Sequence, residues 1–149
     1  MIDGVQIIPL KQFHDERGKV MHMLKVTDDH FMNFGEIYFS CTFPNVVKGW
    51  HKHTEMTINY AVVSGAVKVV LFDDRKESET YGKIQEIFMS PENYSLLIVP
   101  PNIWNGFKGV GTTTSIVANC ASIAHRSDEI IRLPYNSDKI PYDWNIEFK

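Results

Sequence analysis

The stretch VVKGWHKHTEMTINYAVVSG, residues 46–65, contains two histidines separated by a single residue. In an extended strand successive side chains point to opposite faces, so His51 and His53 are predicted to share one face of a strand. Trp50 and Lys52 would share the other face. The two imidazoles are therefore expected to lie side by side, and the rest of the chain decides whether they face the interior of the fold or solvent.

Around this stretch the chain reads as a series of short strands. Residues 57–63 alternate in polarity and predict a strand, Ser64-Gly65 predicts a turn, and the apolar run 66–72 predicts the strand that follows. Other strands are predicted at residues 5–10, 19–26, 35–43, 83–89, 95–99, 104–108 and 112–122. Roughly nine or ten short strands, with only a short helix expected at 127–131, indicate an all-β antiparallel sandwich or barrel.

Composition narrows the class of protein further. The 149 residues, 44% of them hydrophobic, suffice for one domain, residues 1–149, with a packed irregular extension at 133–149. A net charge of -3 lacks the basic excess of a general nucleic-acid binder. No apolar run approaches the roughly 20 residues of a spanning helix and no leader is recognisable, so a cytoplasmic protein without a membrane partner is expected. Cys41 and Cys120 lack CxxC spacing and are expected to be reduced, small core residues.

The histidine pair first suggests a metal site, because neutral imidazole is a common metal ligand. The motifs around it resemble those of the cupin superfamily, which consists of small double-stranded β-helix barrels. The matching residues are Gly49, His51, His53, Gly65, Pro100, Pro101 and Gly106. In metal-binding cupins a glutamate and a third histidine complete the site, whereas this chain has Thr57 or Ile58 and Asn105 there. Glu55 has the same strand parity as the two histidines and could rescue a site only if the strand runs on that far. Two imidazoles alone bind a metal poorly, so no metal is expected.

A second set of motifs runs along the chain in order. It consists of Asp15-Glu16-Arg17-Gly18, Val47-Lys48-Gly49-Trp50-His51, residues 65–70, Asp74-Arg75 with Ser78, Thr80 and Gly82, residues 100–107 and the late segment IPYDW. This order resembles the dTDP-4-dehydrorhamnose 3,5-epimerases, RmlC-like cupins that act without metal on nucleotide-linked 4-keto sugars. The resemblance implies a jelly-roll barrel, a dTDP-type keto-sugar nucleotide as substrate, no cofactor, and a role in polysaccharide or glycan biosynthesis. It also implies a homodimer to which an N-terminal strand contributes.

The resemblance assigns roles to individual residues. It places His51 at the general base that removes a proton beside the ketone, for which the usual pKa of histidine is suitable. It matches Arg17 to an arginine that contacts the diphosphate, and Lys48 to a position usually held by arginine; both side chains suit phosphate. Asn105 stands where the family has a histidine. Trp104 could form a wall of the sugar or base pocket, as could Phe107.

Other family residues are absent. The family's lysine on the next strand, which stabilises the oxyanion, falls on Ile58 or Asn59, and residues 119–124 lack the tyrosine that returns the proton. Tyr60 is the first candidate to supply a phenol instead, and Tyr38 is the second. Asp138 or Asp143 could orient His51.

Three other functions remain open at this point. Sugar-nucleotide 3,4-ketoisomerases resemble the chain in the histidine pair and in Ile103-Trp104 after a proline turn, and there two histidines move protons between adjacent carbons. In that reaction His51 and His53 would both be catalytic. The loss of the family's acid residues also suggests a non-catalytic cupin that binds a sugar nucleotide. The third function is a metal-dependent cupin enzyme.

Overall fold

The computed structural model describes residues 1–145, and short antiparallel strands dominate this part of the chain. The strands are β1 (Gln6–Pro9), β2 (Gln12–Asp15), β3 (Gly18–Met21), β4 (Glu36–Thr42), β5 (Val47–His53), β6 (Ile58–Ser64), β7 (Val67–Phe72), β8 (Ile84–Met89), β9 (Ser95–Val99), β10 (Trp104–Gly109), β11 (Ser115–Ala121) and β12 (Ile130–Arg132). A 3-10 helix, η1 (Ser127–Glu129), precedes β12. The predicted all-β class and the short helix are confirmed.

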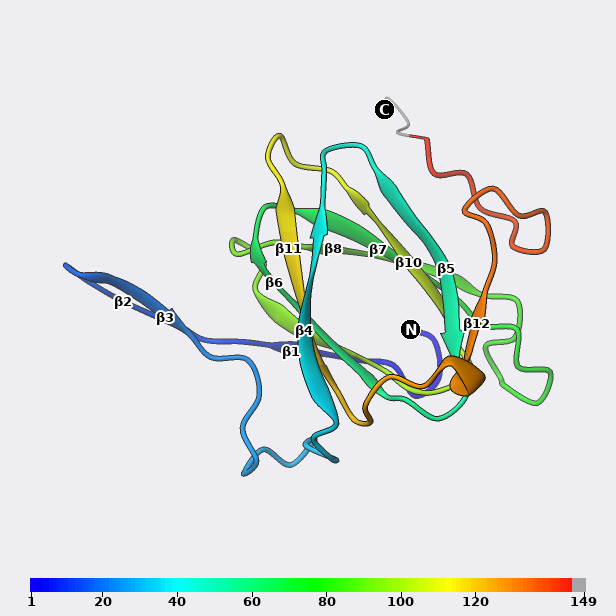
Figure 1. Ribbon diagram of the computed structural model, residues 1–149, viewed down its shortest axis with the longest axis horizontal. Helices are drawn as coiled ribbons and strands as arrows, with labels where there is room; N and C mark the ends of the chain where they lie inside the picture. Colours follow the sequence, from blue (N-terminus) through cyan, green and yellow to red (C-terminus); the bar gives the residue numbers. More distant parts are fainter. Residues whose placement is uncertain (146–149) are drawn as a thin grey trace.

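Two five-stranded sheets form the body of the fold. One has the strand order β1-β9-β6-β11-β4 and the other β12-β5-β10-β7-β8. The strands of the two sheets face each other, while the separate β2–β3 hairpin projects away from them (Figure 1). This arrangement is the antiparallel sandwich or barrel that the short strands predict.

β7 is apolar at every position except Lys68, and the core explains why. Val69 and Leu71 point into the main core between the sheets, whereas Val70 and Phe72 point to the outer face. There they pack with Trp50, Trp104, Ile140 and Trp144, so both faces of the strand are buried. Burying apolar surface on two sides of one sheet contributes roughly 25 cal/mol per Å² on each side.

The segment after β12 forms the outer cover of this sheet. Trp50 Nε1 and Trp144 Nε1 donate to the carbonyl oxygen of Tyr135 at 3.2 and 3.1 Å. Lys108 Nζ donates to the carbonyl oxygen of Trp144 at 2.8 Å. The described part of the predicted extension is therefore irregular but packed, and residues 146–149 lie outside the described residues.

The predicted turn after β6 is confirmed by its backbone. Gly65 has a φ of +74°, a value that side-chain-bearing residues rarely adopt. A Cβ at this position would also lie 2.4 Å from Ser115 Oγ on the neighbouring β11. Glycine is therefore required for both the conformation and the close approach.

Two predictions need correction, and two strands were missed. Cys41 is exposed rather than part of the core, because β4 is an edge strand whose outward face is left uncovered. The strand predicted at residues 19–26 ends at Met21, because its partner β2 is only four residues long; His22 lies beyond it and packs edge-on against Phe13, with ring centroids 5.6 Å apart. The missed strands are β2 and β12.

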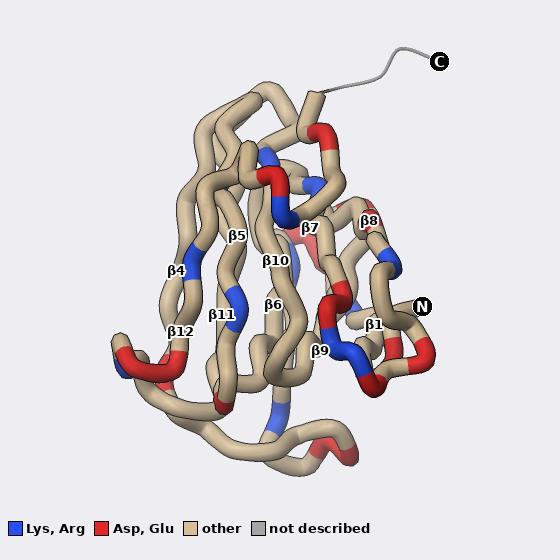
Figure 2. The backbone as a smooth tube through the Cα atoms, turned by 90° about the vertical axis from the view of Figure 1, so that its right-hand side faces the viewer, with Lys and Arg blue, Asp and Glu red and all other residues tan. Residues whose placement is uncertain are grey.

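Charged residues are concentrated in the turns and connecting loops rather than along the strands (Figure 2). The strands of both sheets are consequently dominated by uncharged side chains. Within residues 1–145, no helix is both long and apolar enough to cross a membrane.

Candidate active site

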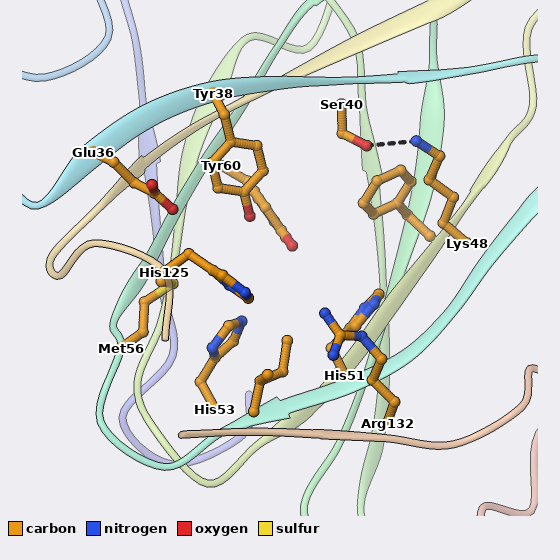
Figure 3. A pocket seen from close by; sticks show the side chains of 12 residues that line it. Glu36, Tyr38, Ser40, Lys48, His51, His53, Met56, Tyr60, His125 and Arg132 are labelled. Atoms are coloured by element: carbon orange, nitrogen blue, oxygen red, sulfur yellow. Dashed lines mark hydrogen bonds between the residues drawn. The ribbon is translucent and has the colours of Figure 1, made fainter. Parts of the chain in front are cut away.

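A cavity of about 460 Å³ lies between the two sheets. It is lined by Glu36, Tyr38, Ser40, Lys48, His51, His53, Met56, Tyr60, Phe107, His125, Ile130 and Arg132 (Figure 3). Such a volume suits a small-molecule site, and ionisable side chains converge on it. The cavity is therefore the candidate active site.

The two walls of the cavity carry different chemistry. The strands β5 and β12 supply the imidazoles and the cations, whereas β4 and β6 on the opposite sheet supply two phenols. His51 and His53 both face the cavity, while Trp50 between them lies in the outer cluster. The prediction that the two histidines share a face is confirmed, and that face points inward.

A bulge in β5 brings Lys48 onto the same wall. Asn105 of β10 pairs with His51 and Phe107 pairs with Lys48, so β5 contains one residue more than β10 across this interval. The extra residue reverses the alternation, and Lys48 faces the cavity although it is three positions from His51. Its Nζ donates to Ser40 Oγ at 2.8 Å. Gly49 lies in the bulge, where a Cβ would come within 2.9 Å of the Tyr135 backbone nitrogen.

His51 is held as a neutral base. Burial, and after it the positive charges of Arg132, His53 and Lys48, together lower its pKa from 6.5 to about 4. Asn105 Nδ2 donates to the backbone oxygen of His51 at 3.0 Å and fixes the strand there. At neutral pH the ring therefore has a free lone pair with which to accept a proton.

His53 has a different environment, because a buried carboxylate holds it. His53 Nδ1 lies 2.6 Å from Glu129 Oε1, and Glu129 is only 1% exposed. The other oxygen of Glu129 accepts from the backbone nitrogens of Met56 and Glu55 at 3.2 and 3.3 Å. Burial opposes ionisation, but these hydrogen bonds outweigh it and hold the pKa of Glu129 below its ordinary value. Glu129 is thus a carboxylate that accepts from Nδ1, so a ligand meets His53 through Nε2.

The opposite wall carries two tyrosines with separate partners. Tyr60 Oη lies 3.2 Å from Asn105 Oδ1, and Asn119 Nδ2 lies 2.9 Å from Tyr38 Oη. Burial raises the pKa of both phenols. Each tyrosine is therefore protonated at neutral pH.

Two predicted substrate-binding residues lie elsewhere. Trp104 is on the outer face of β10, where Nε1 donates to Asp74 at 2.8 Å and Lys52 Nζ lies 4.7 Å from the ring centre. The placement of Trp104 in the pocket is thus corrected: Phe107 lines the cavity and Trp104, three positions earlier, faces away. Arg17 lies in the turn of the β2–β3 hairpin, with its side chain 85% exposed and paired with Asp15 at 2.6 Å. Within one chain it does not line the cavity.

The predicted roles of other residues also change. Asn105 is 1% exposed and supports Tyr60 and His51 rather than lining the cavity. Glu55, considered as a metal ligand, pairs instead with Arg126. Within residues 1–145, no group of three or more His, Cys, Asp or Glu side chains is arranged to hold a metal ion.

Sequence reasoning missed three residues of the site. Glu129 was overlooked in favour of Asp138 and Asp143, and neither Arg132 nor His125 was singled out. Arg132 reaches the cavity because β12 pairs with β5 so that Arg132 lies opposite His51. The one available signal was the β-branched pair Ile130-Ile131, which is consistent with a short strand.

Comparisons with known proteins agree with this site and fold. The model of the family described as dTDP-4-dehydrorhamnose 3,5-epimerase matches residues 1–149. The chain is similar to the crystal structure of a dTDP sugar isomerase from Desulfovibrio desulfuricans, with 42% identity, a TM-score of 0.94, and coverage of 96% of this chain and 92% of that one. The implied jelly-roll cupin barrel is thereby confirmed.

Two curated relatives align over nearly their whole length. A probable low-salt glycan biosynthesis epimerase from Haloferax volcanii is 32% identical, over 98% of this chain and 96% of the relative. A spore coat polysaccharide biosynthesis protein from Bacillus subtilis is 28% identical, over 100% of both chains.

Proposed function

Because this chain belongs to the dTDP-4-dehydrorhamnose 3,5-epimerase family, we propose that it epimerises a nucleotide-linked 4-keto sugar. The observation that carries the proposal is a neutral His51 that faces the cavity between the two sheets, with cations on the same wall and phenols opposite. The names of the relatives support a place in polysaccharide or glycan biosynthesis. The cytoplasmic location expected from the sequence remains part of this proposal.

His51 acts as the general base. A carbon-bound proton beside a ketone becomes removable when the carbonyl oxygen takes up the electron pair as an enolate. A base whose pKa lies far below neutrality is fully deprotonated before substrate arrives, and burial supplies that condition here. The cost is a weaker proton acceptor, so the enolate needs firm stabilisation.

His53 replaces the missing family lysine as the partner of the enolate oxygen. Glu129 accepts from Nδ1 at 2.6 Å, so its negative charge would stabilise a positive charge on the ring when Nε2 takes up a proton. Nε2 then carries a hydrogen that can be donated to the developing oxyanion, where a preorganised donor is most effective. Glu129 is a positioning residue in this scheme. Every step uses side chains of the protein, and no cofactor is invoked.

Lys48 and Arg132 bind the diphosphate. Both line the cavity on the wall of His51, and Lys48 Nζ is already oriented by Ser40. Arginine can grip phosphate oxygens in a bidentate manner, while lysine acts as a compact charge. The dTDP-type substrate is consistent with the name of the Desulfovibrio relative.

Arg17 joins the site only if two chains associate. The β2–β3 hairpin that carries it projects from the body (Figure 1) and exposes Phe13 and Val20, which are 55% and 58% accessible. The outward face of β4 likewise exposes Ile37 and Phe39. Apolar faces of this kind favour association, and a homodimer in which the hairpin reaches the partner would bring Arg17 to a diphosphate.

The test is proton exchange. In deuterated water, dTDP-4-keto-6-deoxyglucose should gain deuterium at C3 or C5 and yield an epimer, and His51→Asn should abolish both while dTDP still binds. His22→Asn, which removes an imidazole outside the cavity, is the matched control and should behave like the parent protein. Binding of dTDP without any exchange would leave the non-catalytic sugar-nucleotide-binding protein as the function.

A 3,4-ketoisomerase is the second candidate, favoured by the two imidazoles on one face of β5. In that reaction the ketone moves from C4 to C3 through an enediol, so the product is a constitutional isomer rather than an epimer. Carbon NMR of the product separates the two, because the position of the carbonyl carbon differs. A product that appears only when metal is added would instead favour the metal-dependent enzyme.

A further inference from the structure

We propose that Tyr38 is the acid that returns a proton to the sugar carbon from the side opposite His51, and that Asn119 positions it. The inference rests on the proposed function and deepens it, because inversion at carbon requires a donor across the cavity from the base. Tyr38 is on β4 and Tyr60 is on β6, in the sheet that faces the histidine wall (Figure 3). The hydrogen bonds of the two phenols decide between them.

The orientation of Asn119 is fixed by its backbone partner. The backbone nitrogen of Asn59 can only donate, so the atom that it meets at 3.0 Å is Asn119 Oδ1. The other end of the amide, Nδ2, consequently donates to Tyr38 Oη at 2.9 Å. Asn119 is fully buried, which leaves it no alternative partner in water. Tyr38 thus uses its oxygen as an acceptor, and its own hydrogen remains uncommitted.

The same reasoning gives the opposite result for Tyr60. The backbone oxygen of His51 can only accept, so Asn105 Nδ2 is the atom that meets it at 3.0 Å. Asn105 Oδ1 therefore faces Tyr60 Oη at 3.2 Å and must accept its hydrogen. The proton of Tyr60 is engaged within the protein, and Tyr60 serves to hold Asn105 behind the base.

Access separates the two phenols as well. Tyr38 is 38% exposed and Tyr60 is 6% exposed, although both line the cavity. A ligand can therefore approach the Tyr38 hydroxyl more freely. Once the proton has left, the Nδ2 hydrogen of Asn119 points at the phenolate oxygen and stabilises it.

The step balances without any further reactant. His51 takes the proton of the carbon beside the ketone, and the released electron pair forms the carbon–carbon double bond of the enolate. When the carbonyl re-forms, the same carbon takes the hydrogen of Tyr38 on its other face. The result is the inverted sugar, an imidazolium at His51 and a phenolate at Tyr38, and proton exchange with water restores both residues.

Tyr38→Phe and Tyr60→Phe form a matched pair for the test, since each removes one hydroxyl from the same wall. Epimer formation and deuterium uptake by the recovered substrate are followed in deuterated water, with dTDP affinity and thermal stability as checks on folding. Tyr38→Phe should still exchange the substrate proton through His51 but lose about 10²–10⁴-fold in epimer formation, the usual contribution of a general acid. Tyr60→Phe should lose less than about tenfold.

Asn119→Asp tests the positioning role. Its second carboxylate oxygen would accept the hydrogen of Tyr38 and turn it away from the cavity, so epimer formation should fall while substrate exchange is retained; a merely structural residue would lower both together. Epimer formation by Tyr38→Phe at the parent rate would overturn the inference and leave the proposed function standing. Absence of exchange in the parent protein would overturn the proposed function and the inference with it.

Discussion

The two walls of the cavity are both formed by antiparallel strands, but one wall carries a proton acceptor and the other carries proton donors. On the β5 wall, burial and neighbouring cations keep His51 without a proton, while Glu129 accepts a hydrogen bond from Nδ1 of His53. On the β4–β6 wall, burial keeps both phenols protonated. Environments that separate the pKa values of facing groups assign acid and base roles. The difference indicates chemistry in which a proton leaves on one side of a sugar and returns on the other.

The largest expected effect comes from removing the base. His51→Gln should reduce deuterium uptake from solvent by about 10²–10⁴-fold, because the neutral imidazole is lost from the β5 wall. NMR of the recovered sugar measures the uptake, and dTDP affinity should change little. Exchange at the parent rate would show that His51 is not the base and that the contrast between the walls is misassigned.

The second largest effect is expected from removing the carboxylate that holds His53. Glu129→Gln should lower kcat by about tenfold to a hundredfold with a small change in KM, because Nδ1 of His53 loses its carboxylate partner but the diphosphate contacts remain. Steady-state kinetics measure the changes in kcat and KM separately. Asp128→Asn, on the neighbouring exposed side chain, is the control, and an equal fall in kcat for both variants would contradict the role of Glu129.

The cations should affect binding rather than chemistry. Lys48→Met should raise KM by about tenfold or more and leave kcat within a few-fold, since a hydrogen bond to a charged group contributes about 1.5–3 kcal/mol. Lys52→Met, on the outer face beside Trp104, is the matched control because its charge is turned away from the cavity. A large fall in kcat with unchanged KM would place Lys48 in the chemistry instead.

The smallest effect is a shift in pH dependence. Because the pKa of His51 is lowered to about 4, kcat/KM should stay level as pH falls from 8 toward 5 and decline near pH 4. Arg132→Gln removes a positive charge that lowers this pKa, so the decline should begin at a higher pH. A decline centred near 6.5 in the parent would show that His51 is not desolvated.

Stability should change over the same range with a fixed sign. The folded state depresses the pKa of His51, so the unfolded chain takes up a proton first as pH falls below about 6.5. This residue therefore contributes stability that is present above pH 6.5 and is lost between 6.5 and about 4. Urea unfolding of the parent and of His51→Gln across that window measures the contribution.

Strand periodicity and motif order predicted much of the fold and part of the site. The two-residue period correctly placed His51 and His53 on one face, because both lie on the same side of the bulge in β5. The same period gives the wrong face for Lys48, whose orientation depends on the register with β10. Trp104 was assigned to the pocket from its place in a motif, and motif order carries no information about which side of a strand faces inward.

The remaining misses depend on contacts between distant parts of the chain. Glu129 follows the histidine by 76 positions and reaches it only because η1 and β12 return to the edge of β5. Cys41 is exposed because β4 is at an edge and nothing within residues 1–145 covers it, which local hydrophobicity does not reveal. Short-range patterns predict strands, whereas these positions depend on the final strand order.

The extra residue in β5 divides one strand into two independently phased segments. Deleting a single residue at the bulge would rotate the segment before it by half a pleat, so that the ammonium group would leave the cavity while the imidazoles stayed in place. The loss of a single residue could thus weaken substrate binding without removing the residues that transfer protons. A natural insertion or deletion at this point could therefore change how the protein binds a diphosphate while its proton-transfer residues stay in place.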